Sequence, residues 1–167
     1  ENRNLSNKIK LNTYFENNKG SKWSRKIYET AEDIINLKFE GDFFSDNSVS
    51  KINKGLSQIF SKDSNYNLSI SVKDKINKFD SVYESIKDNI DSFLENEDLT
   101  ITHYSKYSFM LPKKHWAVYI NWDYGSLPTD WIEALSDYVD QIWVSSNYMK
   151  ACFKDSKIDE NKIKVVN

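Results

Sequence analysis

Glycine, cysteine and histidine are all scarce in this sequence. The four glycines, Gly20, Gly41, Gly55 and Gly125, form neither a G-x-G-x-x-G nor a G-x-x-x-x-G-K pattern, so the common dinucleotide and triphosphate loops are absent. One cysteine, Cys152, and two histidines cannot build a zinc site, and a single cysteine cannot form an internal disulfide. The sequence therefore predicts no metal and no cofactor, and the lone cysteine favours a reducing, cytoplasmic location.

Long apolar runs and a large excess of charge are missing as well. No run approaches the roughly 18 residues that a transmembrane helix needs, and no signal sequence opens the chain. The net charge of −2 implies no broad basic face, which disfavours nucleic-acid binding. Aromatic residues make up 14% of the chain, too many for a disordered protein, and 167 residues suit one domain with a core. We therefore expect a single globular domain over residues 1–167.

Strand-like and helix-like segments alternate along the chain. Alternating or continuous apolar residues predict strands at residues 9–15, 67–72, 99–102, 115–120, 141–144 and 162–166. Apolar residues at helical spacing predict helices over residues 27–35, 48–60, 79–94, 129–139 and 149–153, with Ser24, Ser48, Thr129 and one of residues 145–147 as caps. Residues 39–44 form a short, ambiguous segment whose best interpretation is a strand edge. The alternation predicts an α/β fold, a Rossmann-like, doubly wound parallel sheet of about six or seven strands with helices on both faces.

The last third of the chain carries several residue types in a fixed order. Residues 122–131 read WDYGSLPTDW, and residues 140–146 read DQIWVSS. Phe153 and Ile158 follow, and residues 162–166 read KIKVV. This order resembles the N-terminal domains of GT-B glycosyltransferases that use nucleotide sugars, notably the large retaining families. The first two thirds of the chain agree with that family only in the alternation of strands and helices.

The resemblance implies the acceptor-side half of a two-domain, hexosyltransferase-like enzyme. Its substrates would be a nucleotide sugar, bound mainly by a C-terminal domain that is missing here, and a glycan or lipid-linked acceptor. The chain begins with Glu1 and ends at Asn167 directly after a predicted strand, so we expect a fragment that is inactive or nearly so by itself.

Asp123 is the candidate catalytic residue, and Trp122 and Tyr124 are candidates for acceptor binding. Asp123 follows the buried 115–120 strand and matches the acidic residue of the family's Trp-acid string. A carboxylate between aromatic rings can orient sugar hydroxyls, or assist a proton transfer if desolvation raises its pKa. The alternative is an aspartate that caps the turn into the next helix.

Two further candidates for substrate binding follow predicted strands at the same edge of the sheet. His103 could donate a hydrogen bond to a sugar hydroxyl or a phosphate oxygen, or it could be a structural loop residue. The loop of Asn17, Asn18, Lys19 and Gly20 loosely resembles the family's Gly-rich loop near the transferred sugar, although many members have two adjacent glycines there. The alternative is an ordinary surface loop.

Two other functional classes remain open at this stage. One is a catalytically silent α/β module that binds a carbohydrate or a protein partner. The other is a Rossmann-like enzyme that uses a nucleotide or S-adenosylmethionine, although no Gly-rich loop follows the first predicted strand. Lys113 and Lys114 could touch a membrane surface, but two charges give weak binding. The sequence does not fix the donor sugar, the acceptor, the stereochemistry or the oligomeric state.

Overall fold

The structure is a computed structural model, and it describes residues 34–105 and 114–166. By its internal contacts the chain divides into two units, residues 1–33 and 34–167, and only the second is described below. The strand predicted at residues 9–15 and most of the helix predicted at residues 27–35 lie outside the described residues.

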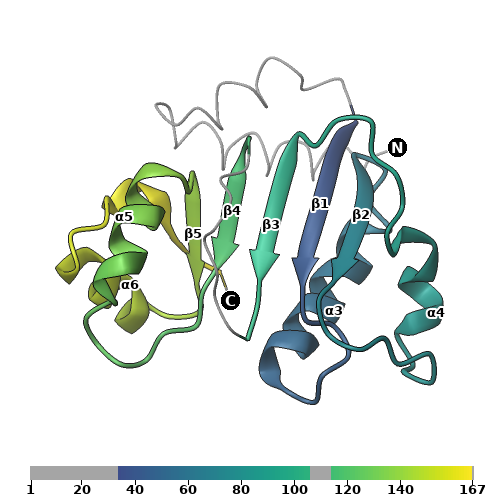
Figure 1. Cartoon of the computed structure of the whole chain (residues 1–167), viewed down its shortest axis with the longest axis horizontal. Helices are drawn as coiled ribbons and strands as arrows, with labels where there is room; N and C mark the ends of the chain where they lie inside the picture. Colours follow the sequence, from purple (N-terminus) through teal and green to yellow (C-terminus); the bar gives the residue numbers. More distant parts are fainter. Residues whose placement is uncertain (1–33, 106–113, 167) are drawn as a thin grey trace, which may run out of the picture. The chain divides into compact units, whose positions relative to one another are not determined.

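The described residues form one sheet with six parallel strands (Figure 1). The strands are β1 (Ile35–Gly41), β2 (Tyr66–Val72), β3 (Leu99–His103), β4 (Trp116–Tyr119), β5 (Gln141–Val144) and β6 (Ile163–Val165). Their order across the sheet is β2-β1-β3-β4-β5-β6, and every neighbouring pair is parallel. The predicted α/β fold with a parallel sheet is confirmed, including the parallel pairing of β4 with β5.

The main helices cover opposite faces of this sheet. Helix α3 (Ser48–Phe60) lies on the face that carries Phe39, whose ring meets the Phe60 ring at 6.5 Å between centroids. Lys38 pairs with Thr100 of β3, and Thr100 pairs with Trp116 of β4, so Lys38 and Trp116 lie on the same face of the sheet. Successive residues of a strand point to opposite faces, so this face is the one opposite to Phe39. Trp116 belongs to the core cluster built with α5 (Thr129–Asp137) and α6 (Asn147–Asp155). The sheet is therefore doubly wound, as predicted.

Helices α3, α5 and α6 begin within one residue of the positions that their predicted caps indicate. The Asn47 side chain, and not Ser48, caps α3 by accepting a hydrogen bond from the Ser50 amide at 2.8 Å. Ser146 caps α6 through the Met149 amide. Thr129 is the first residue of α5, which starts after Pro128 without a side-chain cap.

The helix predicted over residues 79–94 is wrong. Only α4 (Tyr83–Ile86) and the 3-10 turn η1 (Lys87–Asn89) are helical there. The side chains of Asn77 and Asp80 accept hydrogen bonds from backbone amides two residues on, which favours turns over a long helix. Phe79 and Phe93 are 99% and 88% exposed, so the apolar spacing did not mark a buried face.

The start of the described chain also differs from the prediction. Ile35, which the helical spacing assigned to a helix, is the first residue of β1. Residues 39–41 belong to the same strand, and β1 is an inner strand with β2 and β3 as neighbours. Leu37 and Phe39 are fully buried while Lys38 alternates with them, which is the period of a strand.

Candidate functional site

The carboxyl ends of β1 and β3 form the point where the sheet order reverses. From β1 the chain moves outward to β2, then returns to the other side of β1 to form β3, β4, β5 and β6. In open parallel sheets, ligands bind in the crevice outside the carboxyl ends of the strands at such a reversal. Asp42 follows β1, Tyr104 follows β3 and Asn121 follows β4 closely, so these residues gather at one edge.

A buried polar cluster joins the ends of β1 and β3. The Asn53 amide of α3 donates to the Asp42 carbonyl at 2.8 Å and to the His103 carbonyl at 3.0 Å. Its side-chain oxygen lies 2.7 Å from His103 Nδ1. Gly41 makes this approach possible, since a Cβ at that position would lie 2.3 Å from the His103 carbonyl oxygen. The close approach of backbone to backbone explains why glycine occupies the end of β1.

His103 is a buried residue of this cluster and does not face solvent. Because both Asn53 amide hydrogens go to carbonyls, His103 Nδ1 carries the proton and Nε2 lies 3.5 Å from the Asn121 amide. The ring stacks on Tyr119 at 4.4 Å between centroids. Burial lowers the pKa of His103 to about 4, against the opposing charge of Asp42, so the ring is neutral at pH 7. In this arrangement His103 positions the neighbouring backbone through Asn53.

The loop after β1 is held by one carboxylate. Asp74 accepts hydrogen bonds from the amides of Phe43 at 2.8 Å and Phe44 at 2.7 Å, and from both the amide and the hydroxyl of Ser45. Burial opposes ionisation of Asp74, but these hydrogen bonds outweigh it and lower its pKa. The backbone amides of residues 43–45, near the point where the sheet order reverses, therefore all have a hydrogen-bond acceptor.

The loop after β4 displays the sequence-predicted catalytic residue. Asp123 is exposed, and Tyr124 beside it is 83% exposed. Trp122 anchors the loop, because its indole N–H donates to the Gly125 carbonyl at 3.0 Å and its ring packs on Trp131 of α5 at 5.0 Å. Tyr124 meets the Trp122 ring edge-on at 5.1 Å. The anchored tryptophan therefore supports an exposed aspartate and tyrosine.

A further exposed tyrosine comes from helix α6, which follows β5. Tyr148, in the first turn of α6, is 58% exposed. The Cys152 thiol one turn later is the main cause that raises the pKa of the Tyr148 phenol, and the negative charge of Asp123 adds to it. Asp123 follows β4 and Tyr148 follows β5, and because these strands are parallel neighbours both residues come after carboxyl ends at the same edge of the sheet. We name Trp122, Asp123, Tyr124 and Tyr148 the aromatic-acid surface.

Sequence reasoning placed three of these four residues at the site and missed Tyr148. The sequence contained a signal for it, since Met149, Cys152 and Phe153 define the buried face of α6 and leave Tyr148 off that face. The structure brings His103 and Asp123 to the same edge of the sheet, because His103 ends β3, Asp123 follows β4 and the two strands are parallel. The predicted loop of Asn17, Asn18, Lys19 and Gly20 lies outside the described residues.

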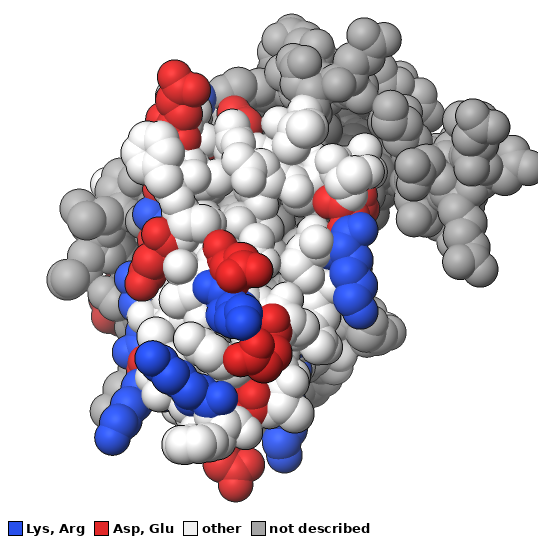
Figure 2. All heavy atoms as spheres, turned by 90° about the vertical axis from the view of Figure 1, so that its right-hand side faces the viewer, with Lys and Arg blue, Asp and Glu red and all other residues white. Residues whose placement is uncertain are grey.

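The described part of the chain shows no metal cluster, and charges of both signs mix on the side of β2. Within residues 34–105 and 114–166, no three His, Cys, Asp or Glu side chains converge on a metal position. Figure 2 shows the side of the molecule at β2 and α4, where, among the described residues, lysines lie among acidic residues and no area of positive sign dominates. Ion pairs such as Lys54 with Asp80 at 2.5 Å account for part of this mixing.

Comparison with known proteins leaves the chain without an assigned relative. No protein-family model matches it, and neither curated proteins nor solved structures show a significant similarity to it. Of the helices that the structure describes, none has the length and apolar character to cross a bilayer.

Proposed function

We propose that this chain is the acceptor-side domain of a nucleotide-sugar-dependent glycosyltransferase with a GT-B fold, and that its aromatic-acid surface binds the acceptor saccharide. The observation that carries the proposal is the exposed Asp123 carboxylate, which follows β4 at the carboxyl edge of the sheet beside the exposed Tyr124, with the exposed Tyr148 after the neighbouring strand β5. The resemblance of residues 122–131 and 140–146 to that family supports the same role.

The chemistry of these side chains suits a sugar. Exposed aromatic rings offer flat apolar faces for the C–H face of a sugar ring. A carboxylate accepts charge-assisted hydrogen bonds from hydroxyls, each contributing roughly 1.5–3 kcal/mol. Because Trp122 fixes the loop through Gly125 and Trp131, little ordering entropy is lost when a ligand binds.

Transfer would need a second, donor-binding domain that closes over this edge. That closure would bring the nucleotide sugar to the acceptor and exclude water from the reacting atoms. In this proposal Asp123 orients the acceptor or the transferred sugar, and His103 positions the edge through Asn53. The enzyme would need no cofactor and would act in the cytoplasm, where its cysteine stays reduced.

The proposal is tested with the protein expressed from its complete gene. Asp123→Asn keeps the shape of the side chain and removes its charge, and we expect transfer to fall by roughly ten- to a hundredfold, since about 1.4 kcal/mol is tenfold in rate. Asp130→Asn is the matched control, because Asp130 is also an exposed carboxylate but lies in the first turn of α5, outside the aromatic-acid surface. Melting temperatures of all three proteins control for folding.

Two outcomes separate the proposal from its alternative. Unchanged transfer by well-folded Asp123→Asn would return Asp123 to a structural role in the turn. Saccharide binding at the aromatic-acid surface without transfer from any nucleotide sugar would favour the catalytically silent carbohydrate-binding module.

A further inference from the structure

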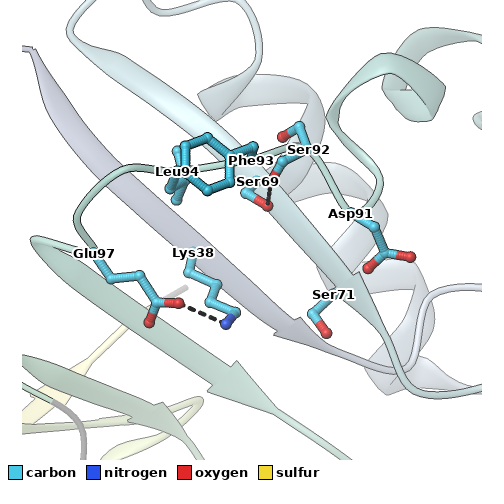
Figure 3. A pocket seen from close by; sticks show the side chains of 8 residues that line it. All are labelled: Lys38, Ser69, Ser71, Asp91, Ser92, Phe93, Leu94 and Glu97. Atoms are coloured by element: carbon cyan, nitrogen blue, oxygen red, sulfur yellow. Dashed lines mark hydrogen bonds and ion pairs between the residues drawn. The ribbon is translucent and has the colours of Figure 1, made fainter.

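A second candidate site lies on a face of the sheet, away from the aromatic-acid surface. A pocket of about 330 Å³ opens over β1 and β2, on the side opposite α3 (Figure 3). Eight residues from β1, β2 and the segment between β2 and β3 line it: Lys38, Ser69, Ser71, Asp91, Ser92, Phe93, Leu94 and Glu97. Its volume lies at the small end of the roughly 300–1,000 Å³ typical of ligand pockets. That size suits a single small ring better than an extended chain.

The floor of this pocket is polar, which is unusual for a parallel sheet. Strand register places Ser69 beside Lys38, and Ser71 beside Glu40. Parallel sheets normally carry apolar side chains on both faces, because helices cover them. The described helices on this side, α5 and α6, pack over β4, β5 and β6. Hydroxyl and charged groups therefore stand on the sheet where an ordinary packing face would be apolar.

The charges around the pocket disfavour an anionic ligand. The Lys38 ammonium lies 2.6 Å from Glu97 Oε1 and 3.5 Å from Glu40 Oε1, so two carboxylates already neutralise it. The hydrogen bond to Glu97 is the main cause that raises the pKa of Lys38. Asp91 adds a further exposed carboxylate to the lining. A phosphate would meet net negative charge here, whereas a neutral molecule with several hydroxyls would find donors and acceptors.

One wall of the pocket is apolar and exposed. Figure 3 shows the side chains of Phe93 and Leu94 together on one side of the pocket. Lys38 and Glu97 lie together on a second side, and Asp91 and Ser71 lie on the side away from Glu97. Phe93 is 88% exposed, although exposing a phenyl ring to water is unfavourable. A ring that stacked on Phe93 would point its edge groups toward the carboxylates and the Ser71 hydroxyl.

From this combination we infer that the pocket binds one neutral pyranose ring. The C–H face of the sugar packs on Phe93 and Leu94. Its hydroxyls donate to the carboxylates of Asp91 and Glu97 and exchange hydrogen bonds with Ser71. The inference stands on the pocket alone and does not rest on the proposed function, because no residue of the aromatic-acid surface lines it.

The test is a titration of the 167-residue chain with methyl glycosides of glucose, galactose and mannose and with N-acetylglucosamine, followed by amide chemical shifts. We expect at least one sugar to bind saturably with a Kd on the order of 1–10 mM, as suits one small ring. The amides of Ser69, Ser71 and residues 91–94 should shift, while those of residues 122–124 should not. Shifts confined to residues 122–124 would overturn the inference and still agree with the proposed function.

Matched variants make the result specific. Phe93→Ala should weaken binding about tenfold, as the loss of a stacking face predicts, while Phe79→Ala removes an equally exposed phenylalanine outside the pocket and should have no effect. Asp91→Asn should weaken binding severalfold. Asparagine tolerates the positive φ of 51° at this position, so the backbone is preserved.

Three results would overturn the inference. The first is no saturable shift up to about 100 mM of every sugar, which is far weaker than the expected range. The second is equal binding by wild type and Phe93→Ala. The third is saturable binding of spermidine in place of the sugars, which would identify the pocket as a site for organic cations.

Discussion

The most informative prediction concerns the acid sensitivity that a buried neutral histidine gives to the fold. The pKa of His103 falls from 6.5 to about 4 because the ring is buried, with Asp42 as the charged group that opposes the shift. In the pH range between these values the unfolded chain binds a proton that the folded chain does not. Stability therefore rises with pH through this range, and the contribution of His103 is lost as pH falls from about 6.5 toward 4.

The size of the effect follows from the shift. Each pKa unit corresponds to about 1.36 kcal/mol, so the full shift represents about 3 kcal/mol. Between pH 7 and pH 5 the expected loss is about 2 kcal/mol, which is a large share of an ordinary domain's roughly 5–15 kcal/mol. With an m value of about 2 kcal/mol per molar urea, the unfolding midpoint should fall by about 1 M.

The assay compares wild type with His103→Gln by urea unfolding at pH 7 and pH 5, followed by tryptophan fluorescence. Asp74 and Asp80 also have lowered pKa values, but their contributions are lost only below their ordinary value of 3.8 and are common to both proteins. The variant should therefore lose most of the difference between the two pH values. Side-chain NMR supplies a second readout, and His115→Gln assigns the only other histidine signal. An equal pH dependence in both proteins, or a His103 signal that titrates near 6.5, would show that folding does not hold His103 in its neutral form.

Three further predictions concern stability and are checked by urea unfolding at pH 7. Gly41→Ala should destabilise the fold by roughly 2–3 kcal/mol, because its Cβ would lie 2.3 Å from a backbone carbonyl oxygen. Gly55→Ala, which places a methyl group in open space on α3, should stabilise it by about 0.5–1 kcal/mol, and equal effects of the two changes would contradict the close approach at Gly41. Asp74→Ala should cost about 3 kcal/mol, because it leaves several donors of the loop after β1 without an acceptor, and Asp74→Asn should cost less. The Lys162 ammonium donates hydrogen bonds to the Leu135 and Ser136 carbonyls in the last turn of α5 and to the Val139 carbonyl that follows the helix. Lys162→Met should therefore lower the free energy of unfolding by about 1–2 kcal/mol, and an unchanged urea midpoint would contradict that role.

The second half of the sheet could be predicted from sequence because its signals agree with one another. The continuous apolar run at residues 115–120 is typical of a strand buried on both faces, and β4 lies at that place. The helices after β4 and β5 carry apolar residues at helical spacing and lie close to their predicted positions. Local propensity, spacing and tertiary burial favour the same structure there.

In the first half, β2 and β3 lie at their predicted places, and the predictions are wrong at the start of β1 and over residues 79–94. Ile35 continues the helical spacing of Ile27 and Ala31, yet it begins a strand. Phe93 misleads in a similar way, since an exposed aromatic at helical spacing imitates a core position. The pocket could not be predicted either, because Lys38, Asp91 and Glu97 come together only through strand register and the path of the chain between β2 and β3.

Saccharide binding at the aromatic-acid surface can be followed through the indole N–H signals of the tryptophans. Neutral tri- to hexasaccharides of glucose, galactose, mannose and N-acetylglucosamine are added to the 167-residue chain. We expect the Trp122 and Trp131 signals to shift saturably, since these rings support Tyr124, and the signal of the buried Trp116 to stay in place. Tyr124→Ala should abolish the shifts. If no oligosaccharide moves the Trp122 and Trp131 signals, or if Tyr124→Ala leaves them unchanged, the claim is contradicted.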